Sequence, residues 1–306
     1  MKEVSAEILS KVELFKEKFM SGAYSFREDG SCVGRQSTEN VEIKNKEGRP
    51  GIEVHVKAGS KGETVTIPTC VTSGNMNDIV YNDFYIGEGA ECTIVSGCGV
   101  HTDDHDDSRH SGVHRFFLGK GSHVKYSEKH VGTGAGEGVR SINPVTQVTV
   151  GEDAILEIDS SQIGGLDKTY RKTTAVVEAR GKLVVRERLL TEGEQVADTD
   201  FEVELRGEDS SADIISRSVA RGHSKQSYTS NIIGKARCSG HSECDSIIDG
   251  DAKVDAAPKL SAYHTDAALI HEAAIGKIAG EQILKLRSLG LDEQEAEAMI
   301  IEGFLS

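Results

Sequence analysis

The 306-residue sequence contains no tryptophan, and aromatic residues make up only 5% of it. Carbohydrate-active enzymes hold sugar rings against the flat apolar faces of aromatic side chains. The scarcity of such side chains disfavours a polysaccharide-cleaving enzyme. No apolar run comes near the roughly 18 residues that a transmembrane helix requires. The amino terminus, MKEVSAEILSK, has the pattern of an amphipathic helix and not of a signal peptide. We therefore expect a cytoplasmic protein without a membrane partner.

Several short motifs of enzyme chemistry are also missing. The sequence has no G-x-x-x-x-G-K-[ST] phosphate loop, and the nearest string, GGLDKT at 164–169, lacks the required spacing. It has no G-x-S-x-G, no H-E-x-x-H and no dinucleotide-binding fingerprint. The sequence therefore predicts a protein that is not itself an enzyme and does not hydrolyse ATP.

Basic residues are few relative to acidic ones. The chain carries 35 Lys and Arg against 50 Asp and Glu, a net charge of −15. Such a surface repels phosphate backbones and anionic lipids, so we expect no nucleic-acid partner. The chain has 6 cysteines, without a C-x-x-C pair or a secretory signal. This usage indicates reduced thiols and argues against a disulfide framework or a zinc ribbon.

A repeat is the main pattern that the sequence does contain. A glycine turn followed by alternating apolar residues recurs at Gly87 (IGEGAECTI), Gly119 (LGKGSHVKY) and Gly151 (VGEDAILEI), at intervals of 32 residues. A turn and a strand at a near-constant period indicate a solenoid of stacked coils. With no helix between the strands, a mainly β fold of the β-helix type fits best, and a β-sandwich is the alternative. We expect Gly59 to share this equivalent turn and all four glycines to use their access to positive φ.

Helical patterns occur only near the two ends of the chain. Residues 5–20 place apolar side chains on one face of a helix, and residues 21–40 are typical of a polar linker. Residues 275–286 have the spacing of an amphipathic helix, which Gly290 ends before a second short helix. We therefore expect an N-terminal helix and linker (1–39), a β-helix core (40–260) and a C-terminal helical segment (261–306).

The most unusual local composition is SGCGVHTDDHDDSRHSGVH at 96–114. This stretch combines Cys98 with imidazoles and carboxylates that would bind a divalent metal if the loop folded around one. A solvated acidic turn between two coils is the alternative interpretation. The imidazoles belong to His101, His105, His110 and His114.

A second stretch, from Arg237 to Phe304, brings different ligands together. Cys244 lies between two carboxylates in the string ECD, and His271 and Glu272 follow at the start of a helical pattern. A thiolate, an imidazole and carboxylates close to a helical tail suggest a metallocofactor site joined to a protein-binding handle. The remaining cysteines are better interpreted as small buried hydrophobic residues. They are Cys32, Cys70, Cys92 and Cys238.

Several strings of this region resemble the SufB/SufD proteins, the scaffold components of iron–sulfur cluster assembly. They are ISRSVARGHSKQSY (215–228), ECDSIIDGDAKVDAAPKL (243–260) and HEAAIGKIAGEQ (271–282), followed by RSLGL and MIIEGF. A looser resemblance reaches back to about residue 85. The chain resembles a minimal version of the family, because it lacks the long N-terminal extension of the larger members.

The resemblance implies a right-handed parallel β-helix with helical ends. It also implies a scaffold on which iron and persulfide sulfur form a transient iron–sulfur cluster. Cys244 would bind the iron and the cluster, with help from His271 and Glu272. Cys98 followed by His110 resembles a pattern in which a core cysteine accepts sulfur and passes it along the β-helix interior.

The resemblance further implies partners. They are a sulfur donor, a SufC-like ABC-type ATPase docked on the C-terminal helices, and a second copy or a related SufB/SufD subunit. Cys244 within ECDS resembles the SufB branch, whereas Ile270 stands where SufB-type sequences often have a glutamate. A non-ligating interaction subunit of the same complex is therefore an alternative, and a β-helix carbohydrate-active enzyme is another. The resemblance leaves open whether a flavin takes part.

Overall fold

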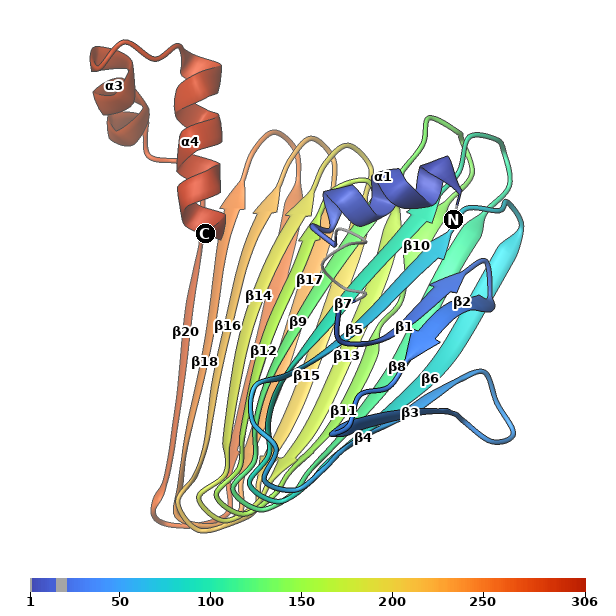
Figure 1. The fold of residues 1–306 in the computed structure, drawn as a ribbon. Coiled ribbons are helices and arrows are strands. Elements are labelled where there is room, and N and C mark those ends of the chain that lie inside the picture. Colours follow the sequence, from blue (N-terminus) through green and yellow to red (C-terminus); the bar gives the residue numbers. More distant parts are fainter. Residues whose placement is uncertain (1, 15–20) are drawn as a thin grey trace.

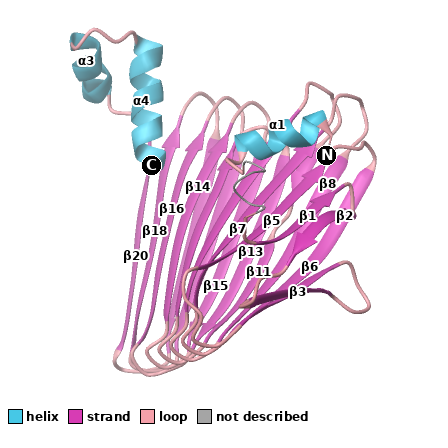
Figure 2. Cartoon of the chain, in the orientation of Figure 1, coloured by secondary structure: helices cyan, strands magenta, loops and turns pink. Residues whose placement is uncertain are grey.

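The fold is a parallel β-solenoid of about 8 turns with helices at both ends of the chain, which confirms the predicted β-helix class. A computed structural model describes residues 2–14 and 21–306. Strands make up 59% of the structure and helices 10%. Figure 2 shows the strands as one stack, with the helices outside it. None of the described helices combines the length and apolar character needed to cross a lipid bilayer.

Two sheets enclose the core, and each coil adds one strand to each sheet. The first sheet has the order β2(Ser31–Gln36), β1(Ala23–Glu28), β5(Glu63–Val71), β7(Glu91–His101), β9(His123–Thr133), β12(Ile155–Ile163), β14(Lys182–Thr191), β16(Ser210–Ala220), β18(Cys238–Ile248), β20(Ala267–Gly276). The second sheet runs from β19(Lys253–Ala262) through β17(Lys225–Gly234), β15(Val196–Leu205), β13(Lys168–Val177), β10(Arg140–Ile142), β8(Ser108–Leu118), β6(Met76–Ile86) and β4(Gly51–Val56) to β3(Val41–Asn45), with β11(Val145–Val150) between β8 and β13.

The predicted glycine turns are equivalent in three of the four coils. The N–H groups of Gly87, Gly119 and Gly151 donate to the carbonyl that ends the corresponding strand of the preceding coil, at 2.9, 2.8 and 3.1 Å. Gly59 does not belong to this set. The pairing of β4 with β6 aligns Gly59 with Gly89, two residues further along the turn.

The prediction that all four glycines use positive φ was wrong. Gly59 and Gly89 have positive φ values of 72° and 64°, whereas Gly87, Gly119 and Gly151 do not adopt that conformation. A Cβ atom on Gly119 would lie 2.8 Å from the backbone nitrogen of Glu88. Glycine is therefore required here because stacked backbones approach closely, and not because of a left-handed torsion.

The interior changes character along each strand. Alternate residues face inward, and on β14 these are Leu183, Val185, Glu187, Leu189 and Thr191. The first inward positions of the strands are mostly apolar and form one continuous core cluster. The later positions carry many buried polar and charged groups. Burying charge is unfavourable unless each charge has a partner, so this polar half of the interior requires an explanation.

The N-terminal region contains more strand than we predicted. The expected linker, 21–40, holds the antiparallel pair β1–β2, and β1 also pairs in parallel with β5. Polar residues dominate this segment, but Ala23, Tyr24 and Phe26 are buried and fix it to the sheet. The N-terminal helix α1(Glu3–Lys11) is shorter than predicted, and residues 15–20 lie outside the described part.

The C-terminal segment also differs from the prediction. The stretch 267–276 forms β20 and not the start of a helix, because it pairs in parallel with β18 over its whole length. Helices follow only as α3(Gly280–Ser288) and α4(Glu293–Leu305). Asp292 and Glu295 form a capping box at the start of α4.

The C-terminal end of the solenoid has two free strand edges. In the described part of the chain, β19 and β20 each pair on one side only. Figure 1 shows α3 and α4 beside the upper ends of the last strands, so that most of β20 stays uncovered. Tyr263 and Ile270, next to these edges, are 69% and 55% exposed. Exposed edges of this kind are ready to pair with another chain.

Candidate functional site

Cys244 lies inside the solenoid, on the last complete coil. Its side chain points inward from β18 and is 2% exposed. Its neighbour on β16 is Ser216 and its neighbour on β20 is Ala273. Burial raises the pKa of the Cys244 thiol to about 11, despite a hydrogen bond with Ser246. The thiol is therefore protonated at neutral pH until a positive ion or group approaches it.

The structure brings His271 and Cys244 to one face of the sheet and places Glu272 on the other. His271 lies opposite Ser242, whose side chain is fully buried, so it shares the inward face with Cys244. Its two ring nitrogens are shielded from solvent and lack hydrogen-bond partners of normal geometry in the described chain, although the backbone of Ser242 is close. Burial lowers the pKa of His271, which keeps the imidazole neutral and able to bind a metal. Strand alternation points Glu272 outward.

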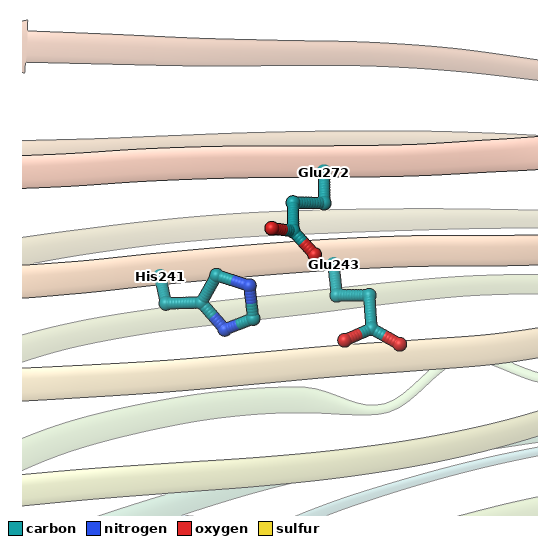
Figure 3. A group of neighbouring side chains, drawn as sticks. All are labelled: His241, Glu243 and Glu272. Carbon is teal, nitrogen blue, oxygen red and sulfur yellow. The ribbon is translucent and has the colours of Figure 1, made fainter.

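Glu272 joins a different group of side chains on the outer face. It pairs with Glu243 on β18, and His241 lies two residues before Glu243 on the same face. The donor atoms of these three residues lie within 4.8 Å of one another. Figure 3 shows the three side chains together over the two strands.

Cys98 has the most reactive setting among the buried thiols. It points inward from β7 and forms hydrogen bonds with His110 on β8 and His130 on β9. Burial alone would raise the pKa of Cys98, but the two histidines outweigh this effect and lower the pKa to about 6. The thiolate and Asp78 in turn raise the pKa of His110 to about 9, against its burial. At neutral pH the site therefore holds the Cys98 thiolate beside the His110 imidazolium. The thiolate is the nucleophilic form of cysteine.

The two residues that flank Cys98 explain how the helix α1 covers this strand. A Cβ atom on Gly97 would lie 2.5 Å from a methyl group of Leu14, and one on Gly99 would lie 2.2 Å from Ile8. The string GCG therefore turns the thiol inward and leaves room outside for the helix. Ile8 and Leu9 are buried in this contact.

A row of buried polar side chains begins next to Cys98. Arg171 donates a hydrogen bond to Glu128 at 2.6 Å and contacts His130 at 3.3 Å. The same guanidinium forms an ion pair with Glu187 at 3.3 Å. Glu187 then accepts a hydrogen bond of 2.7 Å from Ser216, the strand neighbour of Cys244. This polar row therefore links the surroundings of the two thiols through the interior.

The repeat creates the row. Parallel pairing places one inward position of each coil above the next, from β7 to β18. The residues stacked at that position are Ser96, Glu128, Ser160, Glu187, Ser216 and Cys244. We did not predict Glu128, His130, Arg171 or Glu187. Their signal in the sequence is a charged residue where strand alternation requires an inward side chain.

The His/Asp-rich loop does not converge on a metal. His110 and His114 point into the interior from β8 and are buried. A ring nitrogen of His101 lies 2.9 Å from a carboxylate oxygen of Asp103, and exposed His105 contacts Glu137 in the same way. Over residues 2–14 and 21–306, the outer-face set on β18 and β20 is the one ligand cluster with metal-binding spacing.

None of the remaining cysteines shares the interior position of Cys98 or Cys244, although Cys70 is opposite Gly99 on the neighbouring strand. Cys92 and Cys238 belong to the apolar core, and Cys70 packs beneath α1. Burial raises the pKa of all three thiols. Cys32 is exposed on β2. The interpretation as a small buried residue therefore holds for three of the four and is wrong for Cys32.

Comparison with known proteins assigns the chain to a family. The family model described as "SUF system FeS cluster assembly, SufBD core domain" matches residues 71–304. The chain belongs to the SufB/SufD family. That span includes the predicted motifs and both thiol sites.

Curated relatives agree with this assignment. An iron–sulfur cluster assembly SufBD family protein of Methanothermobacter thermautotrophicus is 29% identical over 88% of this chain and 66% of its own length. One of Archaeoglobus fulgidus is 31% identical over 74% of this chain and 60% of its own length. One of Methanocaldococcus jannaschii is 26% identical over 100% of this chain and 98% of its own length. The chain thus spans less than two thirds of the first two SufB/SufD relatives.

Proposed function

We propose that this SufB/SufD protein is a cytoplasmic scaffold on which an iron–sulfur cluster is assembled. Sulfur enters at Cys98, and the nascent cluster is built at Cys244. The observation that carries this proposal is the buried polar row, which links an activated thiolate to the surroundings of a second thiol. A merely structural interior would gain stability from apolar side chains in the same positions.

The first step is a thiol–persulfide exchange. The Cys98 thiolate attacks the terminal sulfur of a donor persulfide, a new sulfur–sulfur bond forms at Cys98, and the donor leaves as a thiolate. The exchange needs no external oxidant or reductant. His110 and His130 keep Cys98 ionised for the attack.

The polar row gives the sulfur a route to Cys244. Five strand spacings separate the strands of the two thiols, a separation of about 24 Å, so direct exchange cannot connect them. Arg171 and the hydroxyl of Ser216 line the interior between them. A small thiol carrier would take the outer sulfur from the Cys98 persulfide, with Cys98 leaving as a thiolate, and would pass it to the Cys244 thiolate in a second exchange of the same kind. Hydrogen-bond donors of this type would stabilise the anionic carrier persulfide in a site closed to solvent.

Cys244 and His271 supply the ligands for the cluster. Iron binds thiolate strongly, and positive charge at the site would favour loss of the Cys244 proton. The unpartnered nitrogens of His271 on the same face offer a second ligand. Two ligands hold a cluster incompletely, which suits a scaffold that must release its product. A second copy or a related subunit, paired along β19 and β20, would complete the set.

We further propose that an ABC-type ATPase docks on α3 and α4. These helices lie outside the solenoid, and no residue of α3 is buried. Leu284 and Met299 are 65% and 50% exposed. The face around Glu281, Lys285 and Ser288 is free for a partner. In this proposal the chain itself is not an enzyme. ATP hydrolysis by the partner drives the conformational change that exposes the cluster.

One observation favours a second function, that of a non-ligating interaction subunit. Glu272 points away from Cys244, and Ile270 stands on the outer face beside it. If Cys244 and His271 alone cannot bind a cluster, the chain would act as a structural subunit that forms dimer contacts with a partner, and the partner would bind the cluster. The two functions differ in whether this chain can bind a cluster by itself.

Anaerobic reconstitution with iron and sulfide separates the two functions. We expect the wild-type protein to gain iron, sulfide and cluster absorbance, and Cys244→Ala to gain none. His271→Ala should weaken the cluster without unfolding the protein. Cys32→Ala and Cys70→Ala are controls that should behave as wild type. A wild-type protein that gains no cluster would establish the non-ligating function, and a fully loaded Cys244→Ala protein would move the site to Cys98.

A further inference from the structure

Three ligand-type side chains meet on the outer face of β18 and β20. Glu243 and Glu272 are direct partners in the parallel pair, and His241 precedes Glu243 by two residues. Their nitrogen and oxygen donor atoms lie within 4.8 Å of one another. Figure 3 shows that the imidazole and the carboxylates gather over the two strands. The sheet separates this group from Cys244, which points to the interior.

His241 is held in an orientation that leaves one nitrogen available. Its Nδ1 atom hydrogen-bonds to Asp213 at 2.8 Å, and Asp213 also accepts a 2.7 Å bond from Arg186. A neutral imidazole that donates its Nδ1 proton to a carboxylate keeps a free lone pair on Nε2. Histidines that bind metals are oriented by such a carboxylate in the same way.

The carboxylates of the group carry negative charge that the protein does not neutralise directly. Neither Glu243 nor Glu272 forms an ion pair with a described lysine or arginine, although Arg217 is close enough to act on Glu243 through space. A cation bound between Glu243 and Glu272 would neutralise this charge.

We propose that His241, Glu243 and Glu272 bind a divalent transition-metal ion, with ferrous iron as the physiological ion. One imidazole nitrogen and two carboxylate oxygens form a mixed donor set that suits such ions, and water would complete the coordination. The ion would contact no thiolate. Its use as an iron reserve for cluster assembly rests on the proposed function, whereas the binding itself does not.

Another histidine–glutamate pair on the same sheet provides a matched comparison. His123 and Glu157 lie on the outer face of β9 and β12 with 2.5 Å between Nε2 and the carboxylate oxygen. This pair has no second carboxylate within ligand distance in the described chain. It should therefore show what an ordinary surface histidine contributes to metal binding.

The test is an anaerobic titration of the metal-free protein with Fe(II) and, separately, with Zn(II), read by competition with a chromophoric chelator. Wild type should bind one ion, and Glu243→Gln and Glu272→Gln should each lose at least about tenfold in affinity. Asp213→Asn should also lose about tenfold, because it orients His241. Cys32→Ser and His123→Gln should bind as wild type. X-ray absorption of the iron-loaded protein should show only nitrogen and oxygen neighbours.

Two results would overturn the site. One is unchanged affinity in both Glu243→Gln and Glu272→Gln, which would leave an adventitious ion only. The other is loss of binding in Cys244→Ser together with sulfur neighbours of iron, which would place the ion at the thiol. If cluster reconstitution fails in wild type while this titration succeeds, the assembly function is wrong and the metal site stands.

Discussion

The thiol of Cys98 and the imidazole of His110 form a hydrogen-bonded pair across the solenoid interior, although they belong to different sheets. Asp78 bonds to the far nitrogen of His110 at 2.9 Å. The three groups form a buried thiol–imidazole–carboxylate series. Such a series activates cysteine as a nucleophile.

Titration of Cys98 should reveal this pair directly. The ultraviolet absorbance of thiolate, taken as wild type minus Cys98→Ser, should rise as the pH passes through about 6. His110→Gln removes the largest favourable charge, so the midpoint should move towards the ordinary value of about 8.5 or above. A wild-type midpoint already at that ordinary value would mean that the thiol is not activated.

Arg171 should be the residue on which the stability of the polar row depends most. Replacing it with Met leaves Glu128 and Glu187 as buried charges without their partner. We expect a loss of about 3–5 kcal/mol in the free energy of unfolding, measured by denaturant titration. Arg188→Met is the matched control, because its ion pair with Asp159 is exposed and should contribute only about 0–1 kcal/mol. Equal effects of the two substitutions would contradict the row's buried charge pairing.

Close stacking of coils predicts a large effect of Gly119→Val. The added side chain would begin with a Cβ atom 2.8 Å from backbone atoms of the neighbouring coil. Overpacking against backbone should lower the free energy of unfolding by about 1–3 kcal/mol. Gly276→Val is the control, since no atom lies within 4 Å of its Cβ position. A wild-type unfolding curve for Gly119→Val would show that the turns can separate.

Removal of the C-terminal helices should separate docking from folding. A chain ending at Gly276 keeps β20 intact and lacks α3 and α4. We expect it to retain its β-sheet circular dichroism and to lose binding to the ABC-type ATPase in a pull-down. Lys285→Glu in the full chain should weaken the same binding. Undiminished binding by the shortened chain would place the ATPase elsewhere on the solenoid.

Sequence periodicity was sufficient to predict the solenoid, but it did not predict whether each side chain points to the interior or to the outer face of its sheet. The 32-residue spacing of Gly87, Gly119 and Gly151 appears directly as stacked turns. The predicted C-terminal helical segment included 267–276 because the helical spacing begins at residue 275, whereas the pairing of 267–276 with β18 makes it a strand. That error hid the fact that His271 and Glu272 must point to opposite faces.

The polar row was harder to predict than the thiols at its ends. Cys98 and Cys244 stand in recognisable strings, whereas Glu128 and Arg171 look like ordinary charged residues of a solvated strand. Their burial depends on which residues of successive coils lie opposite each other, and the number of residues in a coil varies. Glu128 lies 32 residues after Ser96, but Ser216 lies 29 residues after Glu187. A pattern search with one fixed period loses this alignment.

The most direct measurement follows a labelled sulfur atom from one thiol to the other. The protein is incubated with a persulfide donor labelled in its terminal sulfur, and each cysteine is analysed by mass spectrometry. We predict label on Cys98 and Cys244 in wild type, label on Cys98 alone in Cys244→Ser, and no label on Cys244 in Cys98→Ser. Label on Cys244 at the wild-type level in Cys98→Ser would contradict the relay.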